Sequence, residues 1–165
     1  MVMRGAKVWT SRGFTLIELM IGLVLVSIML AIGVPMFEEF IKDQRAKSTS
    51  SDLSVALLLA RSEAVKRNAE VTLEPADGGD DWSVGWTIES PEDGEPDILN
   101  HVQPGDIEIT EINDLEEITF SPAGRADAAA VFEINVDTEV DDVCRRVSVQ
   151  LDGRTSAEKM DCPDE

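Results

Sequence analysis

The sequence predicts an α+β protein in which one long N-terminal helix precedes a series of antiparallel β-strands. Three observations predict this fold class: a 21-residue apolar stretch from Phe14 to Val34, a helical apolar stripe that continues to about Asn68, and short β-rich runs beyond it. The chain has 165 residues, enough for one ordinary domain and an appendage. A large multidomain enzyme is therefore excluded.

The stretch from Phe14 to Val34 is expected to cross a membrane. It contains a single charge, and a helix of that length covers about 30 Å, the thickness of the hydrocarbon layer. Arg4, Lys7 and Arg12 precede it without any acid, and an excess of Lys and Arg holds its side of a span in the cytoplasm. The chain from about Lys42 onward should then lie outside the inner membrane.

A cleavable secretory signal is the alternative interpretation of this stretch. Its apolar run would be shorter and would end at a small-residue cleavage site. Glu18, near the start of the run, also argues against it, because an ionised group at the centre of a span costs about 2.5 to 3.5 kcal/mol and somewhat less near the edge. Such a residue has a partner or a task, so Glu18 is a candidate functional residue.

The segment from Arg12 to Met20 reads RGFTLIELM and resembles the class III signal of type IV pilins and type II secretion pseudopilins. The resemblance implies that a prepilin peptidase removes residues 1–13 by cutting after Gly13, and that the new N-terminus, Phe14, is methylated. It also implies that the helix of residues 14–42 stays in the mature chain. Glu18 would then pair with the N-terminal amine of a neighbouring subunit, which gives the filament its register.

A second helical segment is expected from Glu38 to Asn68. Pro35 should bend the helix, and Ser48 to Ser51 is a stretch where the helix is expected to loosen. The residues of the apolar stripe recur at three- and four-residue spacing: Leu53, Leu57, Ala60 and Ala64, widened by Val55, Leu58, Leu59 and Val65. This segment should dock on a sheet through that stripe.

The remainder of the chain alternates β-rich runs with turn residues. Strands are expected at Glu70–Glu74, Ser83–Glu89, Ile98–Gln103, Ile107–Ile112, Glu117–Ser121, Ala130–Val136, Cys144–Leu151 and Thr155–Met160. Turns are expected at Asp77–Asp80, Pro91–Gly94, Pro104–Gly105 and Asp152–Gly153. Trp86 lies in an alternating strand and is expected to be a core residue.

Four blocks of the domain resemble the FimT/FimU minor pilins and minor pseudopilin H of type II secretion. They are Val55–Arg67 (VALLLARSEAVKR), Gly85-Trp86, Ile118–Arg125 (ITFSPAGR) and Val147–Arg154 (VSVQLDGR). The resemblance implies a pilin-like fold, a periplasmic domain of residues 43–165, and a structural role beside other minor and major pilins near a filament tip. A type IV pilus and a type II secretion pseudopilus are both open at this point.

Cys144 and Cys162 are the only cysteines, and both fall outside the expected span. In an oxidising periplasm a disulfide between them would close an 18-residue loop and add about 3 kcal/mol. A zinc site is not expected, because His101 is the only histidine and is distant in sequence.

Charge argues against general nucleic-acid binding, since 33 acidic residues face 14 basic ones for a net charge of −19. Some FimT-type pilins bind DNA through a Gly-Arg-x-Arg motif, but the corresponding segment here reads Gly153-Arg154-Thr155-Ser156. Arg145, Arg146 and Arg154 are the residues that would contact phosphate. The alternative is that they pair with local carboxylates such as Asp141, Asp142 and Asp152.

No catalytic or cofactor site is expected. A single His allows no Ser-His-Asp or Cys-His arrangement, and no phosphate-binding Gly loop is present. The acidic clusters at Asp77–Asp81 and Asp137–Asp142 do not match the spacing of a calcium-binding loop, so solvated turns are the favoured interpretation. The expected function is therefore structural.

Overall fold

The computed structural model describes residues 14–92, 94–105, 107–136 and 143–162. Within them the chain forms a long helix α1 (Leu16–Arg67), a short 3-10 helix η1 (Trp82–Val84) and a series of strands. It divides into two compact units, the first ending at Glu38 and the second running from Glu39 to Glu165. Each unit is described by itself.

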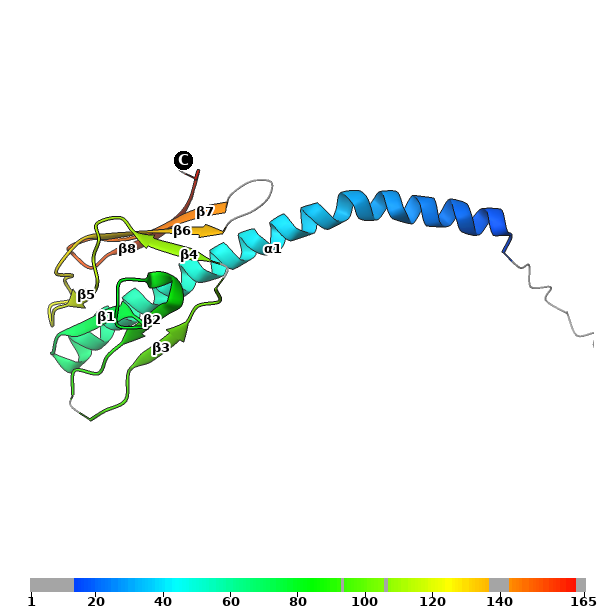
Figure 1. The fold of residues 1–165 in the computed structure, drawn as a ribbon. Helices are drawn as coiled ribbons and strands as arrows, with labels where there is room; N and C mark the ends of the chain where they lie inside the picture. Colours follow the sequence, from blue (N-terminus) through cyan, green and yellow to red (C-terminus); the bar gives the residue numbers. More distant parts are fainter. Residues whose placement is uncertain (1–13, 93, 106, 137–142, 163–165) are drawn as a thin grey trace, which may run out of the picture. The chain divides into compact units, whose positions relative to one another are not determined.

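The strands of the second unit form two antiparallel sheets (Figure 1). The first sheet has the order β3-β2-β1-β5, and its strands are β1 (Val71–Pro75), β2 (Gly85–Ile88), β3 (Leu99–Val102) and β5 (Ile118–Phe120). The second has the order β4-β6-β7-β8, with β4 (Glu108–Glu111), β6 (Ala130–Val136), β7 (Val143–Val149) and β8 (Thr155–Met160). The predicted α+β fold class is confirmed.

The predicted strands are all present. β6 and β8 have the predicted bounds, and each of the others differs from the prediction by one or two residues at both ends. The one local difference is that Ser83 and Val84 belong to η1, because the Asp81 side chain accepts a hydrogen bond from the Ser83 N–H and caps a helical turn there.

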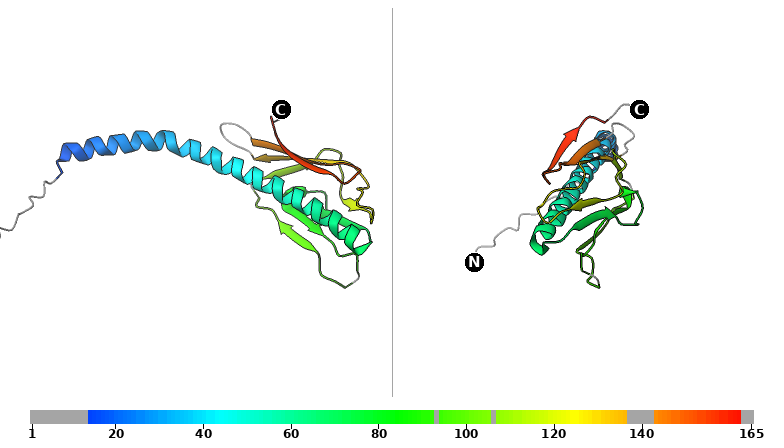
Figure 2. Two further views of the ribbon diagram at one scale, coloured as in Figure 1. Left: turned by 180° about the vertical axis from the view of Figure 1, so that it is seen from behind. Right: turned by 90° about the vertical axis from the view of Figure 1, so that its left-hand side faces the viewer.

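The second unit has one core, formed where the C-terminal half of α1 lies in the angle between the two sheets (Figure 2). Leu53, Leu57, Ala60 and Ala64 are fully buried, as their spacing predicts. The sheets contribute their alternating inward residues, and Trp86 of β2 is buried as expected. Trp82 of η1 packs edge-on against Phe132 of β6, with ring centroids 4.8 Å apart.

Two expectations about the helix were wrong. Ser48–Ser51 does not loosen, because tertiary packing holds it: Thr49 and Ser50 are buried, and Thr49 Oγ1 accepts a hydrogen bond from Gln103 Nε2 (3.0 Å). Residues expected to widen the buried stripe, namely Val55, Leu58 and Val65, are about half exposed or more. Only one face of the helix fits between the sheets, and these three lie on another face.

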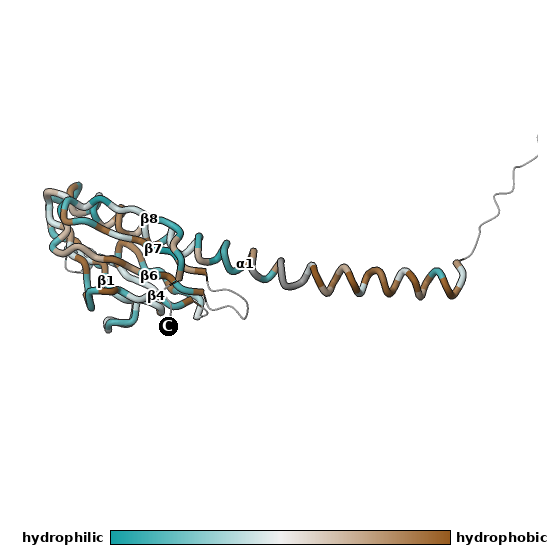
Figure 3. Tube along the Cα trace, turned by 90° about the horizontal axis from the view of Figure 1, so that it is seen from above, coloured by the Kyte–Doolittle hydropathy of each residue, from teal (hydrophilic) through white to brown (hydrophobic). Residues whose placement is uncertain are grey.

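The first unit is the N-terminal part of α1. Most of its residues are hydrophobic (Figure 3), and residues Leu16–Gly33 form a stretch long and apolar enough to cross a membrane. None of that stretch is buried against the protein. Its large side chains, such as Leu23 and Ile28, are more than half exposed. The bend predicted at Pro35 stays a prediction.

Candidate functional site

The start of α1 is organised by a reciprocal pair, Thr15 and Glu18. The Thr15 N–H and hydroxyl group both donate to Glu18 Oε2 (2.9 Å each), and the Glu18 N–H donates to Thr15 Oγ1 (3.3 Å). This is a capping box, in which each side chain satisfies a backbone donor that the first helical turn leaves unpaired. The Thr-x-x-Glu spacing is the signal for it in the sequence, and our sequence analysis missed it.

The capping box leaves one of the two carboxylate oxygens of Glu18 available to a partner. Oε2 is occupied by Thr15, whereas Oε1 receives no hydrogen bond from the described residues. Phe14, directly before Thr15, is 87% exposed. Gly13, the other residue of the expected cleavage site, lies outside the described residues.

The apolar stretch after Glu18 contains few other polar groups that could bind a positively charged partner. Ser27 satisfies its hydroxyl group within the helix by donating to the Leu23 carbonyl (2.8 Å). Glu18 is the only charged residue from Leu16 to Gly33. A partner that brings a positive charge into apolar surroundings at this point would therefore meet one negative charge, that of Glu18.

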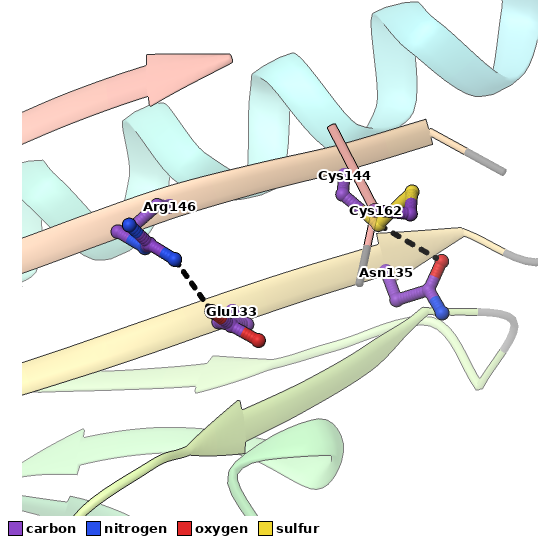
Figure 4. The surroundings of a disulfide bond; sticks show 5 residues. All are labelled: Glu133, Asn135, Cys144, Arg146 and Cys162. Atoms are coloured by element: carbon purple, nitrogen blue, oxygen red, sulfur yellow. Dashed lines mark hydrogen bonds and ion pairs between the residues drawn. A yellow bond between two sulfur atoms is a disulfide. The ribbon is translucent and has the colours of Figure 1, made fainter. Parts of the chain in front are cut away.

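The predicted disulfide is confirmed. Cys144 at the start of β7 is bonded to Cys162, with an S–S distance of 2.10 Å and a Cα–Cα distance of 5.1 Å (Figure 4). Asn135 Oδ1 of the neighbouring strand β6 lies 3.6 Å from Cys144 Sγ. The bond fixes the segment after β8 to the second sheet.

The three arginines considered for phosphate contact do not form one cluster. Arg145 and Arg146 are consecutive on β7 and so point to opposite faces of the sheet. Arg145 reaches Asp43 on α1 (3.3 Å), and Arg146 pairs with Glu133 across the strand (2.8 Å; Figure 4). Arg154 Nε lies 3.2 Å from Asp152 Oδ2 in a turn.

Each of the three arginines therefore pairs with a carboxylate, but Asp43 and Glu133 are distant in sequence from their arginines and were not among the expected partners. Of the expected partners, Asp152 is confirmed for Arg154. Asp141 and Asp142 lie outside the described residues. This arrangement favours a structural role for the arginines over a phosphate-binding surface.

The second unit has a cavity of about 490 Å³ that is lined by acidic residues of the turn before η1, of β4 and of the loop after β4. Glu111 is buried there and accepts hydrogen bonds from the backbone N–H groups of Asn113, Leu115 and Val131. Its charge is therefore satisfied by the fold itself. In the part of the chain that the structure describes, no group of three or more His, Cys, Asp or Glu residues is arranged to hold a metal ion.

The acidic cluster at Asp77–Asp81 forms the predicted turn. The Gly79 N–H donates to Asp77 Oδ1 (3.0 Å), and the Gly78 N–H donates to the Pro75 carbonyl (3.0 Å). Asp77 thus serves the turn that precedes η1. The cluster at Asp137–Asp142 lies outside the described residues.

Comparison with protein families gives two matches that cover most of the chain. The family described as type II transport protein GspH matches residues 49–153, more than half of the protein. The prokaryotic N-terminal methylation motif matches residues 10–34. The comparison with curated proteins gave no match.

Among solved structures, the chain is similar to the type IV minor pilin FimU of Pseudomonas aeruginosa strain PAO1. In space group P21 the TM-score is 0.59 at 24% identity, with 72% of this chain and 92% of that chain covered. In space group P65 the TM-score is 0.55 at 24% identity, with 68% and 91% covered. At this identity the likeness shows a common fold.

Proposed function

Because this chain belongs to the GspH family of minor pilins and pseudopilins, we propose that it is a structural minor pilin of a type IV pilus. It is processed by a prepilin peptidase after Gly13, methylated at Phe14, and joins or primes the filament near its tip. The observation that carries the proposal is Glu18, a single carboxylate at the head of an apolar helix that matches the methylation motif.

The exposed N-terminal helix supports assembly through helix packing. In the separate subunit its apolar residues need a membrane, and in a filament they need neighbouring helices. The second unit also exposes apolar residues on the helix, namely Val55, Leu58 and Val65. Contact with a neighbouring subunit would remove this apolar surface from water. Both features fit a subunit that is surrounded by others.

Glu18 supplies the register of assembly in this proposal. Its oxygen Oε1 is available to the amine of an adjoining Phe14, while Oε2 stays bonded to Thr15. A carboxylate in apolar surroundings carries a free-energy penalty, and pairing with an amine relieves it. Docking at any other height along the helix leaves the charge unpaired, so correct docking is favoured.

The topology follows from the same proposal. The N-terminus lies in the cytoplasm, the helix crosses the inner membrane once, and the second unit lies in the periplasm until the subunit enters the filament. The Cys144–Cys162 disulfide supports this placement, because disulfides persist in oxidising compartments.

The decisive experiment replaces Glu18 with Leu in the full chain, in cells that assemble the filament. The variant should insert, be cleaved and begin at methylated Phe14 by mass spectrometry, yet be incorporated at least about tenfold less than the wild type. Ser27→Leu is the matched control, since it removes a polar group from the same helix without removing the charge. Normal incorporation of Glu18→Leu, or a purified chain that still begins at Met1, contradicts the proposal.

The family's own description favours a second candidate, the minor pseudopilin H of a type II secretion system. The two functions share processing and Glu18, so the experiment above does not separate them. Deleting the gene does: loss of surface pili with normal secretion indicates a pilus subunit, and loss of exoprotein secretion with normal pili indicates a pseudopilin.

A further inference from the structure

The two sheets of the second unit have four edge strands, and the chain itself covers two of them. The edge of β4 is covered by Ser83, whose hydroxyl group accepts from the Ile109 N–H (2.9 Å). The edge of β5 is covered by the segment at Asp127, whose N–H donates to the Thr119 carbonyl (3.0 Å) and whose Oδ1 accepts from the Thr119 N–H (3.0 Å). Strands β3 and β8 are the remaining edges.

The two remaining edges differ in charge. β8 carries Glu158 and Lys159, and charged side chains on an edge discourage pairing with another strand. β3 reads Leu99-Asn100-His101-Val102 and has no charged residue. Val102 is 74% exposed. By charge, β3 is the less protected of these two edges.

The backbone of β3 presents hydrogen-bonding groups outward. The Gln103 N–H donates to the Val84 carbonyl (3.1 Å), which places the ladder bonds to β2 at every second residue of β3. The N–H and carbonyl groups of Asn100 and Val102 therefore point away from β2. They receive no backbone partner from the described residues. Pro96 and Pro104 bracket the strand, so the open edge is short.

A cavity of about 470 Å³ lies along this edge, between β3 and α1. His101 forms part of its wall and is held rigidly, stacked on Trp86 with ring centroids 4.3 Å apart and with Nε2 3.2 Å from Gln103 Oε1. Gln103 in turn donates to Thr49 of α1 (3.0 Å). A strand added beside β3 would direct the side chain next to His101 into this preformed space.

The charges near the edge of β3 indicate which kind of peptide segment would bind there. Between Asn68 and Gly124 there is no Lys or Arg, whereas Asp97 precedes β3 and Glu108 follows it. The cavity wall itself carries one charge of each sign, Arg45 and Asp52, so the negative charge lies at the two ends of the strand. A second copy of this chain would bring these carboxylates against their own equivalents, and like charges in close contact are unfavourable. A segment that is uncharged in its middle and flanked by Lys or Arg complements the edge.

We propose that β3 is a docking edge to which an extended segment of a different filament subunit, with an uncharged middle flanked by Lys or Arg, adds as a fifth strand. The identity of the partner as a filament subunit rests on the proposed function. The added strand bonds to the backbone groups of Asn100 and Val102 and places one side chain in the cavity beside His101.

The first test places the photo-crosslinking residue p-benzoylphenylalanine at position 102 of the full chain, in cells that assemble the filament. Ultraviolet light should join the chain to another filament subunit, within an extended segment flanked by Lys or Arg as mapped by mass spectrometry. The same residue at Ser156 on β8 is the matched control and should give no such product. A product containing a second copy of this chain, or no product with any filament subunit, overturns the proposal.

The second test compares Val102→Pro with Val102→Thr. Proline removes an outward N–H that bonds to nothing in the described chain and occupies the edge, whereas threonine keeps the N–H. Formation of the Cys144–Cys162 disulfide and correct N-terminal processing show that each variant folds and inserts. Val102→Pro should be incorporated at least about tenfold less than Val102→Thr. Equal incorporation of the two overturns the edge proposal but not the proposed function, which fails only if Glu18 is dispensable.

Discussion

The two parts of α1 are built from similar residues for two different environments. From Leu16 to Gly33 the helix exposes every apolar side chain, whereas between Leu53 and Ala64 it buries one face in a core shared with two sheets. The first part therefore has no stability of its own in water and depends on lipid or on neighbouring helices. The second part is stable because it is packed. The same Leu→Ala substitution should thus destabilise the second unit when it is made in the packed part and leave that unit's unfolding unchanged when it is made in the exposed part.

The largest expected effect comes from emptying the core. Leu57 of α1 is fully buried, so Leu57→Ala should destabilise the second unit by about 2 to 5 kcal/mol. Leu25→Ala in the apolar part is the control and should leave the unfolding of the second unit unchanged. Denaturant unfolding of the detergent-solubilised chain, followed by Trp fluorescence, measures both. Equal losses in the two variants would contradict the separation of the helix into two environments.

The disulfide should have the next largest effect, and again only in the second unit. Replacing Cys144 and Cys162 with Ser opens an 18-residue loop and should cost about 3 kcal/mol of unfolding free energy. The matched comparison is the wild-type chain with and without reductant, which should show the same loss. If reduction lowers stability but the double Ser variant does not, the stabilisation does not come from loop closure.

A substitution at Gly153 tests the contact between α1 and two turns, one from each sheet. The φ of Gly153 is +75°, and an added Cβ would strike the Gly124 carbonyl oxygen and lie 2.8 Å from Arg61 Nε. Arg61 donates to the Gly124 carbonyl (2.9 Å) and the Asp152 carbonyl (3.2 Å), so this contact ties both turns to α1. Gly153→Ala should cost about 2 kcal/mol or more.

Gly78 is the matched control for this prediction. Its φ is +70°, but no atom lies within 4 Å of an added Cβ. Gly78→Ala should therefore cost only the backbone strain, about 1 to 2 kcal/mol. Thermal unfolding of the two variants under the same conditions separates strain from close contact, and equal midpoints would show that the Arg61 junction contributes nothing.

The sequence was sufficient for features that depend on local pattern. Alternation of apolar residues predicted the strands, including the bounds of β6 and β8, and the two cysteines in an oxidising compartment predicted their bond. It was insufficient where partners are far apart in the chain. Arg61 and Asp152, or Arg145 and Asp43, are brought together by the packing of helix on sheet, and no local spacing encodes such pairs.

The helix shows the same limit at its surface. The spacing of Val55, Leu58 and Val65 is helical and apolar, as in a buried stripe, yet these residues are exposed. A single sequence predicts which residues share a face of a helix but not which faces meet a sheet. The capping box of Thr15 and Glu18, which the sequence analysis missed, could have been predicted from the sequence, because the Thr-x-x-Glu spacing specifies its hydrogen bonds directly.

The smallest expected effect concerns two carboxylates of the second unit whose pKa values move in opposite directions. On β1, burial and the neighbouring Glu89 and Glu117 raise the pKa of Glu74. On α1, hydrogen bonds from Arg67 and Lys66 lower the pKa of Glu63. Folding therefore favours the proton on Glu74 and disfavours it on Glu63.

These directions fix how stability changes with pH. Glu74 destabilises the fold while charged, so stability rises as pH falls through its raised pKa. The contribution of Glu63 to stability is present above the ordinary Glu pKa of about 4.3 and is lost as pH falls through its lowered pKa.

Glu74→Gln should thus stabilise the protein at pH 7, by about 0.5 to 1 kcal/mol at most, and lose that gain in acid. Glu63→Gln is the opposite control, destabilising at pH 7 and neutral in acid. Thermal unfolding from pH 3 to 8 measures both variants, and a stabilisation by Glu74→Gln that persists at pH 3 would mean that packing, not charge, is what the substitution changes.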